Sequence, residues 1–261
     1  MHQAGDDPHV SSLGFLAMVS FCLGYPDQAL AGSDAAIAEA LGLAHPPSLG
    51  ASLSLACRLL SLVRDDAALD EPAGQLAAVA TEQGFVHLGA QGTMYLGWAK
   101  IKNGDIAQGI LLLRSGSAAY RATGAELWMP HYIGLLAKAY GTAGQSEEAL
   151  ANLDDALQIV EKTGERWLEA ELSRLKGQLM LRQGHVEAAQ ELYRGALRIA
   201  QGQEAKLWEL RAAVSLARLR RDQGRHAEAY DLLAPVYGWF TEGFGTPDLE
   251  NAKALLEALD P

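Results

Sequence analysis

Residues 137–164 read AKAYGTAGQSEEALANLDDALQIVEKTG, with glycines at positions 144 and 164. Glycines recur along the chain at 40-residue intervals, in two grids offset by 20 residues. One grid holds Gly24, Gly104, Gly144, Gly184 and Gly224, with Arg64 in its vacant place; the other holds Gly84, Gly124 and Gly164, with Glu204 in its next place. Glycine is favoured where a helix ends in a left-handed residue, because it has no Cβ to clash. The grids therefore predict a helix, a tight turn and another helix, repeated along the chain.

Three columns of mostly small residues run between the glycines. In the quoted stretch they are Ala137, Ala149 and Ala156, which are 12 and 7 residues apart. Leu150, Leu153 and Leu157 add the helical spacing that buries one face. A lone hairpin cannot bury such a face, so we expect neighbouring hairpins to stack into a solenoid.

The spacing of the small residues resembles that of the tetratricopeptide repeat, whose usual unit is about 34 residues. We therefore expect an all-α, tetratricopeptide-like solenoid of about six 40-residue hairpins and a C-terminal capping helix, in a single domain over residues 1–261. The expected units are roughly 8–45, 46–85, 86–125, 126–165, 166–205 and 206–245, and the expected cap is 247–260.

The charge of the chain excludes several classes of partner. The sequence has 21 Lys and Arg against 32 Asp and Glu, a formal charge of −11. Nucleic acids and anionic membranes are bound by neutralising phosphates, so neither is an expected partner.

The apolar run 13–23 is too short to span a bilayer and follows acidic rather than basic residues, unlike a secretory signal. Two cysteines form no disulfide framework, and we expect a cytoplasmic protein.

Catalytic patterns are missing from the sequence. It contains no phosphate loop of the form G-x-x-x-x-G-K-[ST], no H-E-x-x-H or C-x-x-C metal motif, and no G-x-S-x-G elbow. We predict no catalytic residue, no cofactor and no metal, and we interpret Cys22 and Cys57 as packing residues.

The tetratricopeptide register predicts which residues face the concave groove. Basic residues are unusually frequent there for an acidic protein: Arg58, Lys138, Arg174, Arg211, Arg218 and Arg221, against the single acidic Glu171. Arginine forks bind carboxylates, so we predict a groove for an acidic protein or peptide. The alternative is that these arginines pair with acidic neighbours or only solubilise the face. His131, Trp98 and Met94 are the other predicted contacts, and the apolar Met18 and Phe21 are expected to lie exposed at the N-terminal end of the groove.

Three stretches carry a resemblance to a known family. They are 163–177 (TGERWLEAELSRLKG), 209–224 (ELRAAVSLARLRRDQG) and 232–244 (LLAPVYGWFTEGF). They resemble the C-terminal repeat region of bacterial regulators that carry an adenylate/guanylate cyclase domain, then an ATPase domain, then helical repeats. The repeat domain of the maltose-regulon activator is similar at a greater distance, and there it senses a ligand and contacts other domains.

The resemblance implies a non-catalytic interaction and regulatory module in signal transduction, similar to the sensor end of these proteins. A second interpretation is a small-ligand sensor, with a closed aromatic pocket near Trp98, Met94 and His131. A third is an orphaned C-terminal fragment of an adenylate cyclase-like protein. Cyclase activity of the chain itself is argued against by the missing phosphate loop.

Overall fold

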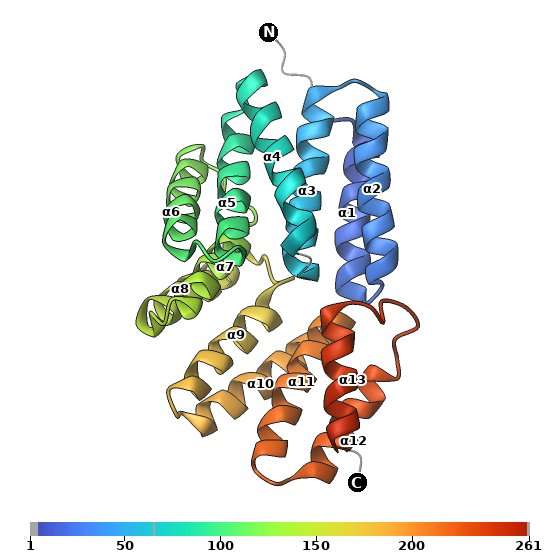
Figure 1. Cartoon of the computed structure of the whole chain (residues 1–261), viewed down its shortest axis with the longest axis vertical. Helices are drawn as coiled ribbons and strands as arrows, with labels where there is room; N and C mark the ends of the chain where they lie inside the picture. The colour runs from blue at the N-terminus through green and yellow to red at the C-terminus, as the bar shows by residue number, and fades with distance from the viewer. Residues whose placement is uncertain (1–4, 65, 260–261) are drawn as a thin grey trace.

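Residues 5–64 and 66–259 are described by a computed structural model, and within them the chain forms thirteen α-helices and no strand (Figure 1). In chain order they are α1 (Pro8–Leu23), α2 (Pro26–Gly42), α3 (Pro46–Val63), α4 (Asp66–Gln83), α5 (Val86–Lys102), α6 (Ile106–Ala122), α7 (Met129–Thr142), α8 (Ser146–Thr163), α9 (Glu169–Arg182), α10 (Val186–Gly202), α11 (Lys206–Asp222), α12 (His226–Tyr237) and α13 (Pro247–Leu259). The prediction of an all-α solenoid of about six hairpins with a final helix is confirmed.

The helix ends follow the two predicted grids. Gly144 has φ +77° and Gly164 has φ +75°, and the other glycines of the grids share this left-handed conformation. The two grid places without glycine adopt it as well, since Arg64 has φ +67° and Glu204 has φ +55°. A side chain in this region costs free energy, so the repeat geometry holds these two residues against their own preference.

Small residues let the paired helices approach closely. A Cβ added to Gly97 of α5 would lie 2.9 Å from the carbonyl oxygen of Gly109 in α6. One added to Gly116 would lie 2.9 Å from the carbonyl oxygen of Ala90. Ala149 and Ala156 of α8 are fully buried in the same columns. The columns therefore set how closely two helices of a hairpin can pack, which is their role in tetratricopeptide repeats.

The solenoid curves until its first and last hairpins touch. In Figure 1 the blue pair α1 and α2 lies against the red C-terminal segment, and α1 also contacts α11. The carboxylate of Glu242 accepts hydrogen bonds from the main-chain N–H groups of Asp27 (3.0 Å) and Gln28 (3.1 Å) at the start of α2. The main-chain N–H of Gly243 donates to the Asp27 carboxylate at 2.9 Å. We call this contact between residues 24–28 and 239–243 the closure seam.

Aromatic packing completes the closure. Trp239 packs on Tyr25, with ring centres 5.5 Å apart, and Phe21 of α1 meets Trp208 of α11 edge to face at 5.7 Å. Met18 and Phe21 are 4% and 1% exposed. Their predicted exposure was wrong, because the closed turn brings α11 onto this part of α1.

One helix of the described chain, α3, is long and apolar enough to cross a membrane. Its mean hydropathy is 1.2, and 72% of it is buried within the fold. In this structure α3 therefore packs as a core helix of the solenoid.

Candidate functional site: a cationic cavity on the inner face

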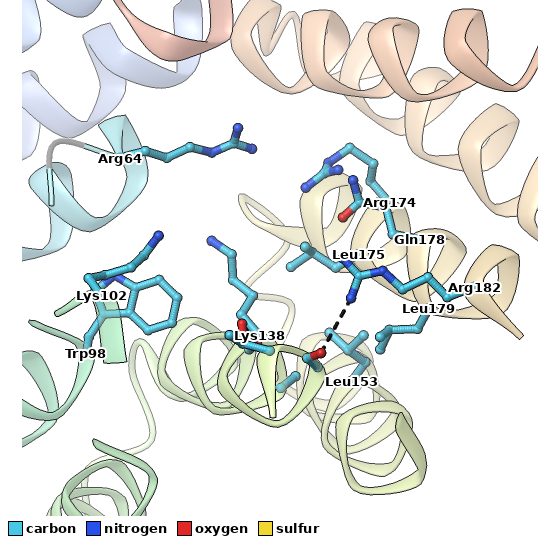
Figure 2. Close-up of a pocket in the computed structure, with 13 residues that line it drawn as sticks. Arg64, Trp98, Lys102, Lys138, Leu153, Arg174, Leu175, Gln178, Leu179 and Arg182 are labelled. Carbon is cyan, nitrogen blue, oxygen red and sulfur yellow. Dashed lines mark hydrogen bonds between the residues drawn. The ribbon is translucent and has the colours of Figure 1, made fainter. Parts of the chain in front are cut away.

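A cavity of about 320 Å³ lies on the inner face of the closed turn (Figure 2). Its charged walls come from the last residue before the α3–α4 turn and from the C-terminal halves of α5, α7 and α9. These residues are Arg64, Lys102, Lys138, Arg174 and Arg182. Trp98 forms one side, and Leu153, Leu175 and Leu179 form an apolar side. The first helices of successive hairpins face inward, so residues 40 apart in sequence converge here.

The charge of the cavity is opposite to that of the protein. Five cationic side chains line it, and no carboxylate does among the described residues. In Figure 2, Arg64 and Lys102 approach from one side, Arg174 and Arg182 from the other, and the Lys138 ammonium extends between them. Like charges at close quarters repel, so this arrangement favours an anion in the centre.

A buried ion network holds the cationic wall in place. Arg174 donates to both oxygens of Glu171, from Nε at 2.6 Å and from Nη2 at 2.8 Å. Arg211 donates to both oxygens of Asp248 on α13, at 2.9 and 2.6 Å, and to Glu171 at 3.2 Å. Arg64 lies 3.3 Å from the Asp248 carboxylate. Bidentate geometry of this kind fixes orientation as well as charge.

The network shifts the ionisation of its members. Burial alone would raise the pKa of Glu171, but Arg174 and Arg211 overcome it and hold that pKa far below its usual range. The pKa of Asp248 is lowered in the same way, burial being outweighed by Arg211 and Arg64. Repulsion from Arg211, together with burial, lowers the pKa of Arg64 to about 10. Both carboxylates are therefore fully ionised near neutral pH.

Lys138 is the most perturbed cation of the cavity. Removal from water lowers its pKa to about 7; attraction to Glu171 opposes this shift, and repulsion from Arg64, Arg211 and Arg174 adds to it. No described carboxylate lies within ion-pair distance of its ammonium, which instead lies 5.3 Å from the centre of the Trp98 ring. Lys138 thus changes charge close to neutral pH unless an anion binds beside it.

Trp98 lines the same cavity. Its side chain is 3% exposed, and its indole Nε1 is buried without a hydrogen-bond acceptor among the described residues. Because the Nε1 atom is shielded from solvent, Trp98 offers the cavity its aromatic ring.

The eight residues predicted to bind a partner fall into three groups. Lys138, Arg174 and Trp98 line the cavity. Arg211 is 3% exposed within the ion network, Arg218 is exposed and donates to Asn251 at 3.3 Å, and Arg221 is partly exposed and pairs with Asp222 at 2.8 Å. Met94 and His131 are buried away from the cavity. The structure thus brings three of the eight to the cavity, and Arg211 and Arg218 line a smaller adjoining pocket together with Arg174.

His131 belongs to the aromatic core. It is 1% exposed, packs between Tyr132 and Trp167 with ring centres 5.5 and 6.1 Å away, and lies 3.4 Å from the Ser61 hydroxyl. Burial, with repulsion from Arg58, lowers its pKa well below the usual value. His131 is therefore neutral near pH 7.

Three cavity residues were missed by the sequence analysis. Ile101 and Leu181 lie multiples of 40 residues before the predicted Arg221, and Lys102 and Arg182 each follow one of them, so the helical register was displaced by one residue at these helix ends. Arg64 stands in a glycine place of the grid. The sequence does mark this position, because a cation stands where the turn favours glycine.

No group of three or more His, Cys, Asp or Glu side chains within the described ranges could hold a metal ion. Burial raises the pKa of the Cys22 thiol to about 12, and Cys57 is buried as well. Neither thiol is activated as a nucleophile, because a reactive cysteine needs a lowered pKa.

Comparisons with known proteins agree with this fold. Sequence models of the tetratricopeptide repeat match residues 129–202 and 210–235. An uncharacterized protein of Rhizobium meliloti (strain 1021) is 30% identical over 217 residues, which are 82% of this chain and 21% of that protein. The chain therefore spans about a fifth of the length of this curated relative.

Two solved structures show the same architecture at low identity. A Rap protein complexed with Competence and Sporulation Factor has a TM-score of 0.67 at 13% identity, over 95% of this chain and 73% of that one. A Signal Transduction ATPase with Numerous Domains from Pyrococcus horikoshii, with a tetratricopeptide repeat sensor, has a TM-score of 0.54 at 12% identity, over 96% of this chain and 38% of that one. The chain contains tetratricopeptide repeats and folds as a tetratricopeptide-like solenoid.

Proposed function

We propose that this chain is a regulatory binding module that binds an anionic ligand or acidic segment on its inner face and catalyses no reaction. The observation that carries the proposal is the convergence of five cations in one cavity of a protein with net charge −11. Repeat solenoids present such inner surfaces to their partners, while the fold itself implies no chemistry.

The wider setting follows from the family resemblance. We propose that the chain acts as a single domain in the bacterial cytoplasm, as the sensor end of a signalling protein similar to the cyclase–ATPase regulators. The structural similarity to an ATPase with a tetratricopeptide repeat sensor supports this arrangement. The relative's much greater length leaves room there for further domains. Cyclase activity is no part of the proposal.

The test is whether the cavity retains a ligand from a cell extract. The chain is incubated with bacterial extract, repurified, and its bound peptides and metabolites are identified by mass spectrometry. We expect an acidic species on the wild type that is lost from Lys138→Glu with Arg182→Glu, at unchanged helical circular dichroism. Lys162→Glu is the matched control, because Lys162 is 75% exposed and far from the cavity wall. The same retained species on all three proteins, or none on any, contradicts the proposal.

A second candidate function, docking of another helical hairpin, is favoured by one face of α1. Phe15, Leu16 and Val19 are 46%, 61% and 52% exposed. Forty residues later, Leu55, Ala56 and Leu59 of α3 are 8%, 2% and 1% exposed, within the packing of α3 on α1 and α2. Phe15 stacks on Trp128 with ring centres 6.1 Å apart, and Phe15 and Val19 line an apolar pocket with Trp128 and Trp167. The rest of this exposed face continues the row of hairpin-to-hairpin interfaces, and the occupant that fits it is the second helix of another hairpin.

This docking can be tested by supplying such a helix. A copy of residues 186–205, which contain α10 and its following turn, is fused ahead of residue 6 in place of residues 1–5, in the register of the repeat. The fused chain should unfold at higher urea concentration than the parent, and Val19→Glu should abolish the gain. An unchanged midpoint overturns docking, and self-association of the parent at this face would assign the surface to a second copy instead.

A further inference from the structure

We propose that the cationic cavity binds a compact organic polyanion, a small molecule with at least two carboxylate or phosphate groups on a short carbon skeleton. The inference rests on the proposed function and names the chemical class of ligand for that same cavity.

The positive charge around the cavity exceeds what the described carboxylates neutralise. Two carboxylates, Glu171 and Asp248, serve three guanidinium groups, those of Arg64, Arg174 and Arg211. Lys138 and Arg182 have no described carboxylate within ion-pair distance. Leaving Lys102 aside, five cations therefore face two anions, a surplus of three positive charges. A ligand with a single charge would leave most of that surplus in place.

The arrangement of the cations favours several anionic groups on one molecule. Arg64 approaches from the residue that follows α3, Lys138 from α7, and Arg174 and Arg182 from positions about two turns apart on α9 (Figure 2). The Nη1 atom of Arg182 makes only a 3.5 Å contact with the carbonyl oxygen of Gly141, so most of its donors remain available. Guanidinium forks bind planar carboxylates and phosphates through two donors, and each such contact fixes one anionic group.

The remaining wall indicates an organic ligand of small size. Leu175 and Leu179 of α9 and Ala137 of α7 line the apolar side, where a carbon skeleton would displace water. A volume of about 320 Å³ is near the lower end for small-molecule sites.

Trp98 would report on the bound molecule. Its indole side chain lines the cavity. Its ring also lies beside two ammonium groups, 5.0 Å from that of Lys102 and 5.3 Å from that of Lys138. An anion that draws these ammonium groups away from the ring should therefore change the fluorescence of Trp98.

Calorimetry with defined probes tests the proposal. Citrate and pyrophosphate are titrated into the full chain at constant ionic strength, with acetate and a tetraglutamate peptide as comparison probes. We expect citrate or pyrophosphate to bind more tightly than acetate by at least about a hundredfold. Each of Lys138→Gln and Arg182→Gln should weaken binding by about tenfold or more, as loss of a charge-assisted contact does. Lys162→Gln is the matched control and should bind as the wild type does.

Two further readouts separate a built site from general charge attraction. Trp98→Phe replaces the indole with a smaller aromatic ring, and it should abolish the ligand-induced fluorescence change, which would assign that change to the cavity and not to the other tryptophans. The affinity for citrate should fall as pH rises from 6.5 to 9 in the wild type and stay nearly constant in Lys138→Gln. Arg182 lies at the accessible end of α9, so Arg182→Gln tests the site without disturbing the buried network.

The outcomes distinguish this inference from the proposed function. Binding of neither polyanion at millimolar concentration overturns the inference, and so does equal binding by wild type and Lys138→Gln. Tetraglutamate bound in preference to citrate, with loss in Lys138→Gln, also overturns it but leaves the binding module in place. If the extract experiment retains no acidic species either, both proposals fall.

Discussion

Arg211 of α11 donates a hydrogen bond to the main-chain carbonyl oxygen of Leu62 in α3, across 149 residues of sequence. The same guanidinium binds both oxygens of Asp248 on α13. One buried side chain thus joins the second hairpin, the last hairpin and the final helix. The closed turn of the solenoid therefore depends on these hydrogen bonds as well as on packing between neighbouring hairpins.

Replacing Arg211 should therefore destabilise the whole fold. Arg211→Met leaves Asp248 and Glu171 buried with fewer cationic partners, and breaking such a buried pair costs about 3–5 kcal/mol. The free energy of unfolding, measured by urea denaturation followed by circular dichroism, should fall by about that amount. Arg221→Met is the control, because Arg221 pairs only with Asp222 at the surface and should change stability by less than about 0.5 kcal/mol. Equal losses in the two variants would refute a special role for Arg211.

Acid should weaken the fold through Glu171. Its folded-state pKa is lowered by Arg174 and Arg211, whereas in the unfolded chain it is about 4.3. A carboxylate with a depressed pKa contributes stability that is complete above its unfolded pKa and is lost as pH falls through the folded one. We expect the free energy of unfolding to fall steadily below about pH 4, and less steeply in Glu171→Gln. Identical slopes in the two proteins between pH 4 and 2.5 would exclude this group as the cause.

Gly243 should tolerate no side chain. It has φ +75°, and a β-carbon there would collide with the ring of Pro26 across the closure seam. Gly243→Ala should cost about 1–3 kcal/mol through strain and displaced packing. Amide hydrogen exchange should rise at the start of α2 and in α13. Gly245→Ala is the control, since nothing lies within 4 Å of its added β-carbon; a stable Gly243→Ala with unchanged exchange would contradict the importance of the seam.

The partly buried, charged Lys138 should lower the free energy of unfolding. Its folded pKa is about 7 against about 10.4 in the unfolded chain, so the unfolded chain binds more protons between these values and stability rises with pH there. Lys138→Met removes this penalty and should raise the free energy of unfolding by about 1–3 kcal/mol at pH 6, with the gain shrinking toward pH 10. Lys162→Met, at an exposed position, should show no such gain. Destabilisation by Lys138→Met at pH 6 would contradict the lowered pKa.

Much of the fold could be predicted because each helix end repeats a local signal. A left-handed turn residue such as Gly144 depends only on its neighbours in sequence, and Pro247 starts the last helix as expected. Repeat positions held by small residues, such as Ala149 and Ala156, mark close contacts between the two helices of one hairpin. Signals of this kind can be recognised in the sequence without knowing the rest of the structure.

The closed turn could not be predicted in this way, because its closure is the sum of small rotations between successive hairpins. Met18 and Phe21 were expected to be exposed at the N-terminal end of the groove. Instead Phe21 packs on Trp208, and Trp239 packs on Tyr25 in the closure seam. Their partners lie roughly 190–210 residues away in sequence, beyond the reach of any periodic pattern.

The candidate site was predictable only in part for the same reason. The register placed Lys138, Arg174 and Trp98 on the inner face, but it could not show that Glu171 and Asp248 engage Arg174 and Arg211. Pairing depends on how neighbouring helices are rotated about their axes. Met94 and His131 shared the same columns, and that rotation buries them in the core.

The left-handed Arg64 has a consequence for protein engineering. An engineer who rebuilt this solenoid from its consensus repeat would place glycine at position 64, since glycine holds that turn without strain. The redesigned chain would gain stability and lose one of the guanidinium groups that surround the cavity. Idealising the scaffold would thereby remove one cation of the proposed binding site, and the more stable protein should bind the proposed ligand less tightly.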